Sequence, residues 1–148
     1  MRFMSVLPSG GALDLVILKA HLLLDEQINV LIDERLDNAV ALRSADLDSF
    51  QRICLAESFF SAAFQPWLWG ALKHLNKLRN EIAHEIAPEG LQARVDNIIK
   101  SVPSASEFRP FAATHQAHFE MALWSLFDAV SRLVKSPKAS AVGLFSSK

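Results

Sequence analysis

The chain has 148 residues, of which 51% are hydrophobic and 21% are charged, and this composition is typical of one folded domain and far from that of a disordered chain. Its 15 lysines and arginines nearly balance 16 aspartates and glutamates, so the formal net charge is -1. This balance excludes the overall positive charge of a duplex-binding protein. Any nucleic acid would have to bind through a local basic patch.

The N-terminal part of the chain predicts a short leader followed by a long helix. Residues 1–11 contain a proline and two glycines, and we expect a flexible leader there. Over 12–37 hydrophobic residues recur three and four positions apart, which predicts a helix; they are Leu13, Val16, Ile17, Ala20, Leu24, Ile28, Leu31, Ile32 and Leu36. Further leucines widen this stripe, namely Leu15, Leu18, Leu22 and Leu23. The helix is therefore expected to be central in a bundle or to be shared with a second subunit.

Two further helices are predicted in the middle of the chain. After a connector, Ser44 or Asp46 could cap a second helix over 47–63. Pro66 suits the first turn of a third helix over 67–84. Neither segment shows the alternation of apolar and polar residues that is typical of a strand.

The C-terminal part predicts two more helices and a tail. A fourth helix is expected over 89–100, and a fifth over 111–135 after a proline-containing loop. Residues 136–148 are rich in serine and lysine, and we expect a mobile tail. The fold class is therefore predicted to be all-α, as a single-domain antiparallel bundle of four to five helices over 12–135.

The sequence also predicts where the protein resides. The only cysteine, Cys54, lies between apolar residues, which is typical of a buried, reduced thiol in a cytoplasmic protein. The N-terminus lacks the unbroken apolar run of a signal peptide. The apolar segment 13–24 is too short and too charged to span a bilayer. We therefore expect a cytoplasmic protein without a membrane partner.

The side chains best suited to chemistry gather at the end of the third helix. These are Arg79, Asn80 and His84. An arginine can clamp a phosphate through two parallel hydrogen bonds, and a histidine titrates near neutral pH and can move a proton. Together they are suited to work on a phosphodiester.

Helical periodicity gives this segment one polar side. That side carries Lys73, Lys77, Asn80 and His84, while Arg79 lies at its border. The two lysines could guide an RNA backbone electrostatically. On a regular helix Arg79 and His84 point about 140° apart and lie ~7.5 Å apart along the axis. Either the helix is distorted near its end, or a second copy of the chain completes the site.

The segment Arg79-Asn80-Glu81-Ile82-Ala83-His84 resembles the Arg-polar-x-x-x-His signature of the HEPN superfamily. The long first helix before it is similar to the layout of these small helical domains. The resemblance implies a two-fold homodimer that cleaves single-stranded RNA without a metal or another cofactor. In this scheme His84 acts as general acid or base, Arg79 stabilises charge on the phosphoryl oxygens, and Asn80 holds the imidazole or the phosphate.

The resemblance also implies partners. HEPN domains occur in toxin-antitoxin and phage-defence systems, so a protein antitoxin or a regulatory partner is expected. In one branch of HEPN toxins a tyrosine two positions after the motif histidine is modified by the antitoxin. Here Ile86 occupies that position and the chain contains no tyrosine, so this mode of neutralisation is excluded at the site.

Structural alternatives remain open for each of these residues. Arg79 could pair with Glu81, Glu85 or a neighbouring helix, and His84 could satisfy carbonyls at a helix end. The lysines could simply be a solvated face. The chain would then be a non-catalytic regulatory or interaction domain similar to the mannitol operon repressor family. His115 and His118 are three positions apart but lack a second ligand pair, so we expect no metal site.

Overall fold

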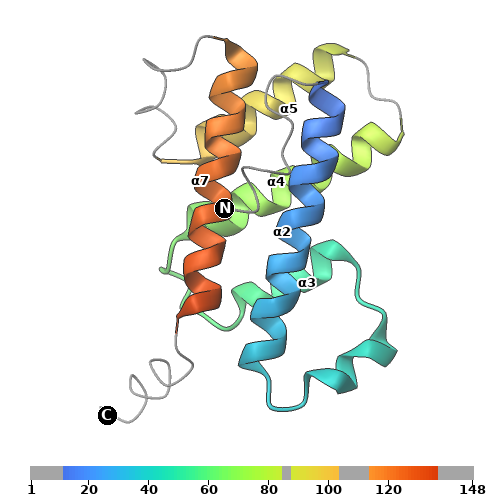
Figure 1. Cartoon of the computed structure of the whole chain (residues 1–148), viewed down its shortest axis with the longest axis vertical. Coiled ribbons are helices and arrows are strands. Elements are labelled where there is room, and N and C mark those ends of the chain that lie inside the picture. Colours follow the sequence, from blue (N-terminus) through green and yellow to red (C-terminus); the bar gives the residue numbers. More distant parts are fainter. Residues whose placement is uncertain (1–11, 85–87, 104–113, 137–148) are drawn as a thin grey trace.

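The structure, a computed structural model, describes residues 12–84, 88–103 and 114–136. In these ranges it has helices and turns and no strand, which confirms the all-α fold class. The helices shown in Figure 1 are α2 (Leu13–Arg35), η1 (Ala39–Ala45, a 3-10 helix), α3 (Ser49–Glu57), α4 (Pro66–Ala83), α5 (Pro88–Ser101) and α7 (His115–Lys135). The predicted leader and, beyond Ser136, the predicted tail lie outside the described residues.

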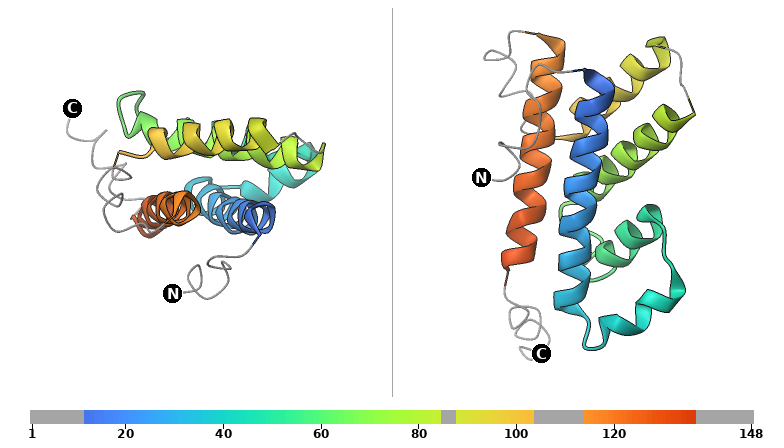
Figure 2. Two further views of the ribbon diagram at one scale, coloured as in Figure 1. Left: turned by 90° about the horizontal axis from the view of Figure 1, so that it is seen from above. Right: turned by 45° about the vertical axis from the view of Figure 1, so that its right-hand side comes forward.

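The helices form two layers. Helices α2 and α7 lie side by side in one layer, and α4 and α5 form the other, as the view from above shows (Figure 2). Within their layer α4 and α5 run in opposite directions, whereas α2 and α7 begin at the same end of the molecule (Figure 1). Arg35 joins the other ends of α2 and α7, because its guanidinium donates to the carbonyl oxygens of Leu133 at 3.2 Å and Ser136 at 3.4 Å.

The predicted apolar stripes form the core between these layers. On α2 the residues at most 4% exposed include Val16, Ile17, Ala20, Leu24, Ile28, Leu31 and Ile32. On α7 the buried residues include Phe119, Ala122, Leu123, Leu126, Val130 and Leu133. Full burial of one such large aliphatic or aromatic side chain stabilises the fold by about 1.5–3 kcal/mol. The core therefore fixes α2 against α7, α3 and α4.

The second set of leucines on α2 divides between core and surface. Leu23 is 4% exposed, but Leu15, Leu18 and Leu22 are 43%, 38% and 66% exposed. These three positions share one face of α2, which we call the leucine face. The helix is thus central to the fold and also presents apolar surface to the solvent.

The start of α3 differs from the prediction. Asp48 caps the helix rather than Ser44 or Asp46: its carboxylate accepts from the Gln51 N–H at 2.8 Å, and the Gln51 side chain accepts from the Asp48 N–H at 2.9 Å. This reciprocal capping box fixes the first turn at Ser49. Asp46 has a positive φ of 51°, which ends η1 before α3 can begin.

The end of α3 also differs, since α3 stops at Glu57 and not near residue 63. The chain turns there, and Phe60 stacks on Phe64 with ring centroids 5.0 Å apart. These aromatic contacts are tertiary and are not visible in the helical periodicity of the sequence. The prediction for the next helix is confirmed, because Pro66 occupies the first turn of α4.

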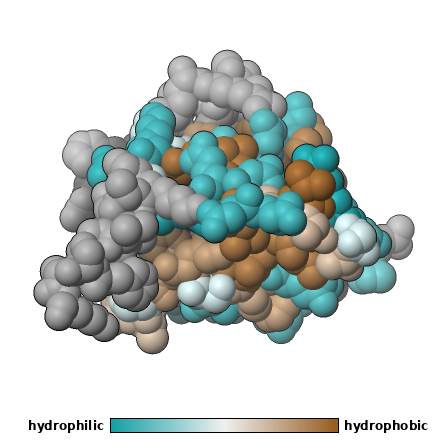
Figure 3. Space-filling model, turned by 90° about the horizontal axis from the view of Figure 1, so that it is seen from below, coloured by the Kyte–Doolittle hydropathy of each residue, from teal (hydrophilic) through white to brown (hydrophobic). Residues whose placement is uncertain are grey.

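The lower end of the molecule carries apolar surface. In the view from below, apolar side chains gather in the middle of this face and hydrophilic ones border them (Figure 3).

Among the helices that the structure describes, none combines the length and the hydrophobicity that a membrane span requires.

Candidate phosphate-binding site

Arg79 and Asn80 lie in a pocket where α4 meets α2 and the start of α3. The pocket has a volume of about 330 Å³ and is lined by His21, Asp48, Ser49, Phe50, Arg52, Asn76, Arg79 and Asn80. Arg79 donates to the side-chain oxygen of Asn80 at 3.4 Å. Two of the three predicted catalytic residues therefore share a pocket with a histidine from another helix. We call it the Arg79 pocket.

His84 lies apart from this pocket. Helix α4 remains α-helical through Ala83, and the His84 N–H closes its last turn by donating to the carbonyl oxygen of Glu81 at 3.1 Å. The His84 side chain is exposed and does not line the Arg79 pocket. A regular helix keeps Arg79 and His84 about 140° apart. Up to Ala83 the structure therefore shows no distortion of α4 that would bring Arg79 and His84 together, and residues 85–87 before Pro88 lie outside the described ranges.

The surroundings of Arg79 also test the structural alternative. Glu81, one of its expected partners, instead accepts from Arg94 of α5 at 2.9 Å. Glu85 lies outside the described residues. Within the part of the chain that the structure describes, Arg79 pairs with no carboxylate. Its positive charge is available to a ligand.

The two lysines of the predicted polar side have different environments. Lys73 forms an ion pair with Glu57 of α3, with 2.6 Å between the Nζ and Oε1 atoms. Lys77 is exposed one turn further along α4. The pairing offsets much of the Lys73 charge, so Lys77 is the better suited of the two to contact a phosphate backbone.

His21 of α2 is held in the Arg79 pocket by a buried amide. The His21 Nε2 atom lies 3.1 Å from the Oδ1 atom of Asn76, which is only 7% exposed. Burial lowers the pKa of His21; the Asn76 hydrogen bond and the charge of Asp25 oppose this effect, whereas Arg79 and Arg52 add to it. His21 is therefore neutral at pH 7. With Nε2 donating to Asn76, its Nδ1 atom keeps a lone pair.

Arg52 supplies a second fixed positive charge. Its guanidinium donates to Asp25 at 2.9 Å and to the Ser49 hydroxyl at 3.2 Å, and it also contacts the Leu47 carbonyl oxygen. The buried Nε atom finds no acceptor among the described residues. These contacts hold Arg52 in one orientation, while Asp25 neutralises part of its charge.

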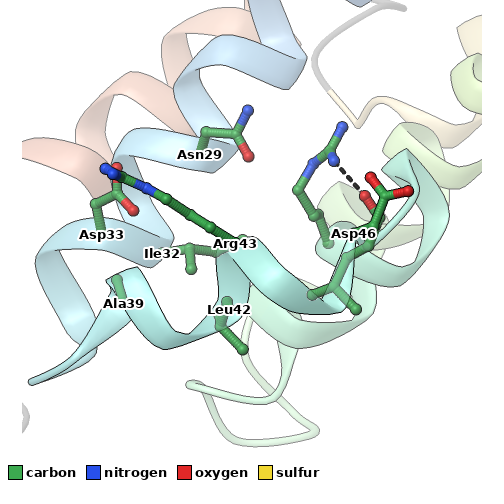
Figure 4. A pocket seen from close by; sticks show the side chains of 9 residues that line it. Asn29, Ile32, Asp33, Ala39, Leu42, Arg43 and Asp46 are labelled. Carbon is green, nitrogen blue, oxygen red and sulfur yellow. Dashed lines mark hydrogen bonds between the residues drawn. The ribbon is translucent and has the colours of Figure 1, made fainter.

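A second pocket, of about 380 Å³, lies between α2, η1 and α3. Asp33 and Arg43 lie at one end of it and Asp46 at the other (Figure 4). Two carboxylates, Asp33 and Asp46, and two arginines, Arg43 and Arg52, line this pocket, so the charges balance. This pocket therefore favours an anion less than the Arg79 pocket does.

No group of three or more His, Cys, Asp and Glu side chains within the described ranges is placed to hold a metal ion. His115, considered as a metal ligand from the sequence, instead lies with its Nε2 atom 2.6 Å from Asp96 of α5. This contact joins the start of α7 to α5. The histidine accordingly has a structural role.

Sequence reasoning missed His21 and Asn76 as site residues. Asn76 precedes Asn80 by four positions and Arg79 by three, so all three lie on neighbouring faces of α4. The signal available in the sequence was Asn76 itself, an amide among the apolar residues of α4. His21 lies at the border of the α2 apolar stripe, and only the crossing of α2 and α4 brings it to Asn76.

Comparison of the chain with protein-family models, curated proteins and solved structures finds no match. The resemblance to HEPN domains therefore rests on the motif and on the order of the helices.

Proposed function

We propose that the protein is a metal-independent endoribonuclease of the HEPN type that acts as a homodimer on single-stranded RNA. The observation that carries this proposal is the Arg79 pocket, where two amides and a neutral histidine converge on an arginine that has no carboxylate partner among the described residues. Arginine and amide donors are suited to phosphate oxygens, and a neutral histidine is suited to accept a proton.

The reaction that fits these groups is internal transesterification. The ribose 2′-oxygen bonds to the adjacent phosphorus and gives up its proton to a base, while the bond from phosphorus to the 5′-oxygen breaks. That leaving oxygen takes a proton from an acid. Arg79 stabilises the negative charge that develops on the phosphoryl oxygens, and His84 supplies acid-base catalysis. DNA lacks the 2′-hydroxyl group and would not react.

A homodimer explains how His84 reaches the site. Because α4 is regular, His84 points away from the Arg79 pocket of its own protomer. The leucine face of α2, made by Leu15, Leu18 and Leu22, offers apolar surface for a second copy. Helical periodicity places Leu18 beside His21 on α2, so this face adjoins the pocket. A two-fold axis there would bring each His84 toward the other copy's Arg79.

The size of the pocket is compatible with a single nucleotide. Its volume of about 330 Å³ lies at the lower end of the range for small-ligand sites. Exposed Lys77 on the same helix would attract the RNA backbone beside it. A toxin or defence effector of this kind would act in the cytoplasm and would need an antitoxin or regulatory partner to restrain it.

Cleavage of a mixed single-stranded RNA in EDTA tests the proposal. We expect the wild type to cleave, and we expect Arg79→Ala and His84→Ala to lose about 100-fold or more of the rate. Matched controls are Arg132→Ala on α7, whose side chain is 80% exposed, and His74→Ala, exposed on α4. All variants should keep the wild-type helical content by circular dichroism.

Two results would contradict the proposal. The wild type could prove inactive after an inhibitory partner has been excluded by mass spectrometry, or the activity could be indifferent to both motif substitutions. Either result would favour the regulatory domain similar to the mannitol operon repressor family. In that case the leucine face would bind a partner, and the protein would have no catalytic activity.

A further inference from the structure

We propose that His21 is the proton acceptor of the Arg79 pocket: it faces the phosphate held by Arg79 and takes the proton of the RNA 2′-hydroxyl group. This inference rests on the proposed ribonuclease function and adds a catalytic residue outside the Arg-polar-x-x-x-His motif. His84 of a second copy is then left with the role of the acid that protonates the 5′-oxygen.

Three observations place His21 in this role. It lines the same pocket as Arg79 and Asn80 within one protomer. Its Nε2 atom is engaged by Asn76 at 3.1 Å, so the ring has a fixed orientation and tautomer. Asn76 is itself buried at 7% exposure, which makes it a rigid positioning residue.

The step balances within the site. The proton of the 2′-hydroxyl group moves to the Nδ1 atom of His21 as the 2′-oxygen bonds to phosphorus. Breakage of the bond between phosphorus and the 5′-oxygen leaves a 2′,3′-cyclic phosphate, and the 5′-oxygen gains a proton from the imidazolium of His84. His21 then gives its proton to water, and His84 regains a proton from water.

The charged groups around His21 suit a base that becomes a cation. Asp25 of α2 acts on it electrostatically, and it shares the pocket with Asp48 and Arg52 at the start of α3 and with Arg79 of α4. Without a ligand, burial and the two arginines keep the imidazole neutral. A bound phosphate would offset the arginine charges, so the pKa of His21 should rise when the site is occupied.

An NMR titration of the wild-type histidines, without and with uridine 3′-monophosphate, tests the placement. We expect nucleotide to raise the pKa of His21 in the wild type and to leave it unchanged in Arg79→Ala. His74, which lies on the opposite side of α4 from Asn76, is the internal control. A His21 titration curve that does not move at millimolar nucleotide would overturn the inference.

The pH dependence of RNA cleavage tests the chemistry. His21→Gln keeps a polar side chain near Asn76 but cannot take the proton, and we expect it to lose about 100-fold of the rate and the acidic limb of the pH profile. The matched control is His74→Gln. If His21→Gln cleaves with the wild-type rate and pH profile, the inference fails and the proposed ribonuclease stands. If the wild type does not cleave RNA but nucleotide still raises the pKa of His21, the proposed ribonuclease function is contradicted. The Arg79 pocket would then remain supported as a phosphate-binding site.

Discussion

The two histidines near Arg79 have opposite environments. His21 is partly buried, hydrogen-bonded to a buried amide and placed in the same pocket as Arg79. His84 is exposed at the end of α4, five positions after Arg79 and on another side of the helix. His21 is therefore fixed beside Arg79 by the fold of a single protomer, whereas under the proposed function His84 would reach a phosphate at Arg79 from a second copy.

This difference shows that a motif can be contiguous in sequence and divided in space. Arg79 and Asn80 gain neighbours from α2 and α3 because α4 crosses both helices at that point. His84 lies beyond the crossing. If the proposed function holds, the motif needs an interface between two copies as well as the fold of one.

Substitution of the leucine face should separate the roles of the two histidines most strongly. Leu22→Glu places a charge on the most exposed of these leucines, and we expect it to convert a dimer into a monomer and to abolish cleavage. The Arg79 pocket within each protomer should survive, so nucleotide should still shift the His21 titration. Light scattering gives the mass, with Val40→Glu, which is exposed on η1, as the control. A wild type that is monomeric at micromolar concentration would contradict this prediction.

Removal of the Asn76 amide should destabilise the fold, because it takes away the hydrogen-bond partner that holds His21. Asn76→Ala deletes the partner of His21 in a buried setting and should lower the free energy of unfolding by about 1–3 kcal/mol. Asn80→Ala, at an exposed position on the same helix, should change it by about 0.5 kcal/mol or less. Urea denaturation measures both. Equal effects of the two substitutions would show that the hydrogen bond to His21 contributes little.

A smaller effect is expected in the pH dependence of stability. Because folding lowers the pKa of His21, the unfolded chain binds more protons just below pH 6.5. The contribution of His21 to the free energy of unfolding is therefore complete above pH 6.5. It declines as the pH falls toward the lowered pKa of His21 in the folded protein. Thermal melts from pH 7.5 to 5 should show a smaller loss for His21→Gln than for the wild type. Identical curves would mean that folding does not shift this pKa.

The sequence predicted the helices better than the site. Apolar periodicity identified α2 and α7 because their stripes are long. It placed the start of α7 too early, at residue 111, because the helix begins at His115, where the Thr114 side chain caps it by accepting from the Ala117 N–H. It extended α3 too far, since the turn after Glu57 depends on aromatic contacts between residues such as Phe60 and Phe64. For the site, local spacing identified Arg79 and Asn80. His21 is 55 positions away from Asn76, and only the packing of α2 on α4 joins them.

Mixing inactive variants tests the composite site most directly. Arg79→Ala and His84→Ala chains, refolded together, should form heterodimers with one intact site and recover about a quarter of the wild-type cleavage. Arg79→Ala mixed with His21→Ala should recover nothing beyond the separate variants, because both residues belong to one protomer's pocket. Rescue in the first mixture alone is the predicted result. No rescue in the first mixture, or rescue in both, would contradict a site in which Arg79 and His21 come from one copy and His84 from the other.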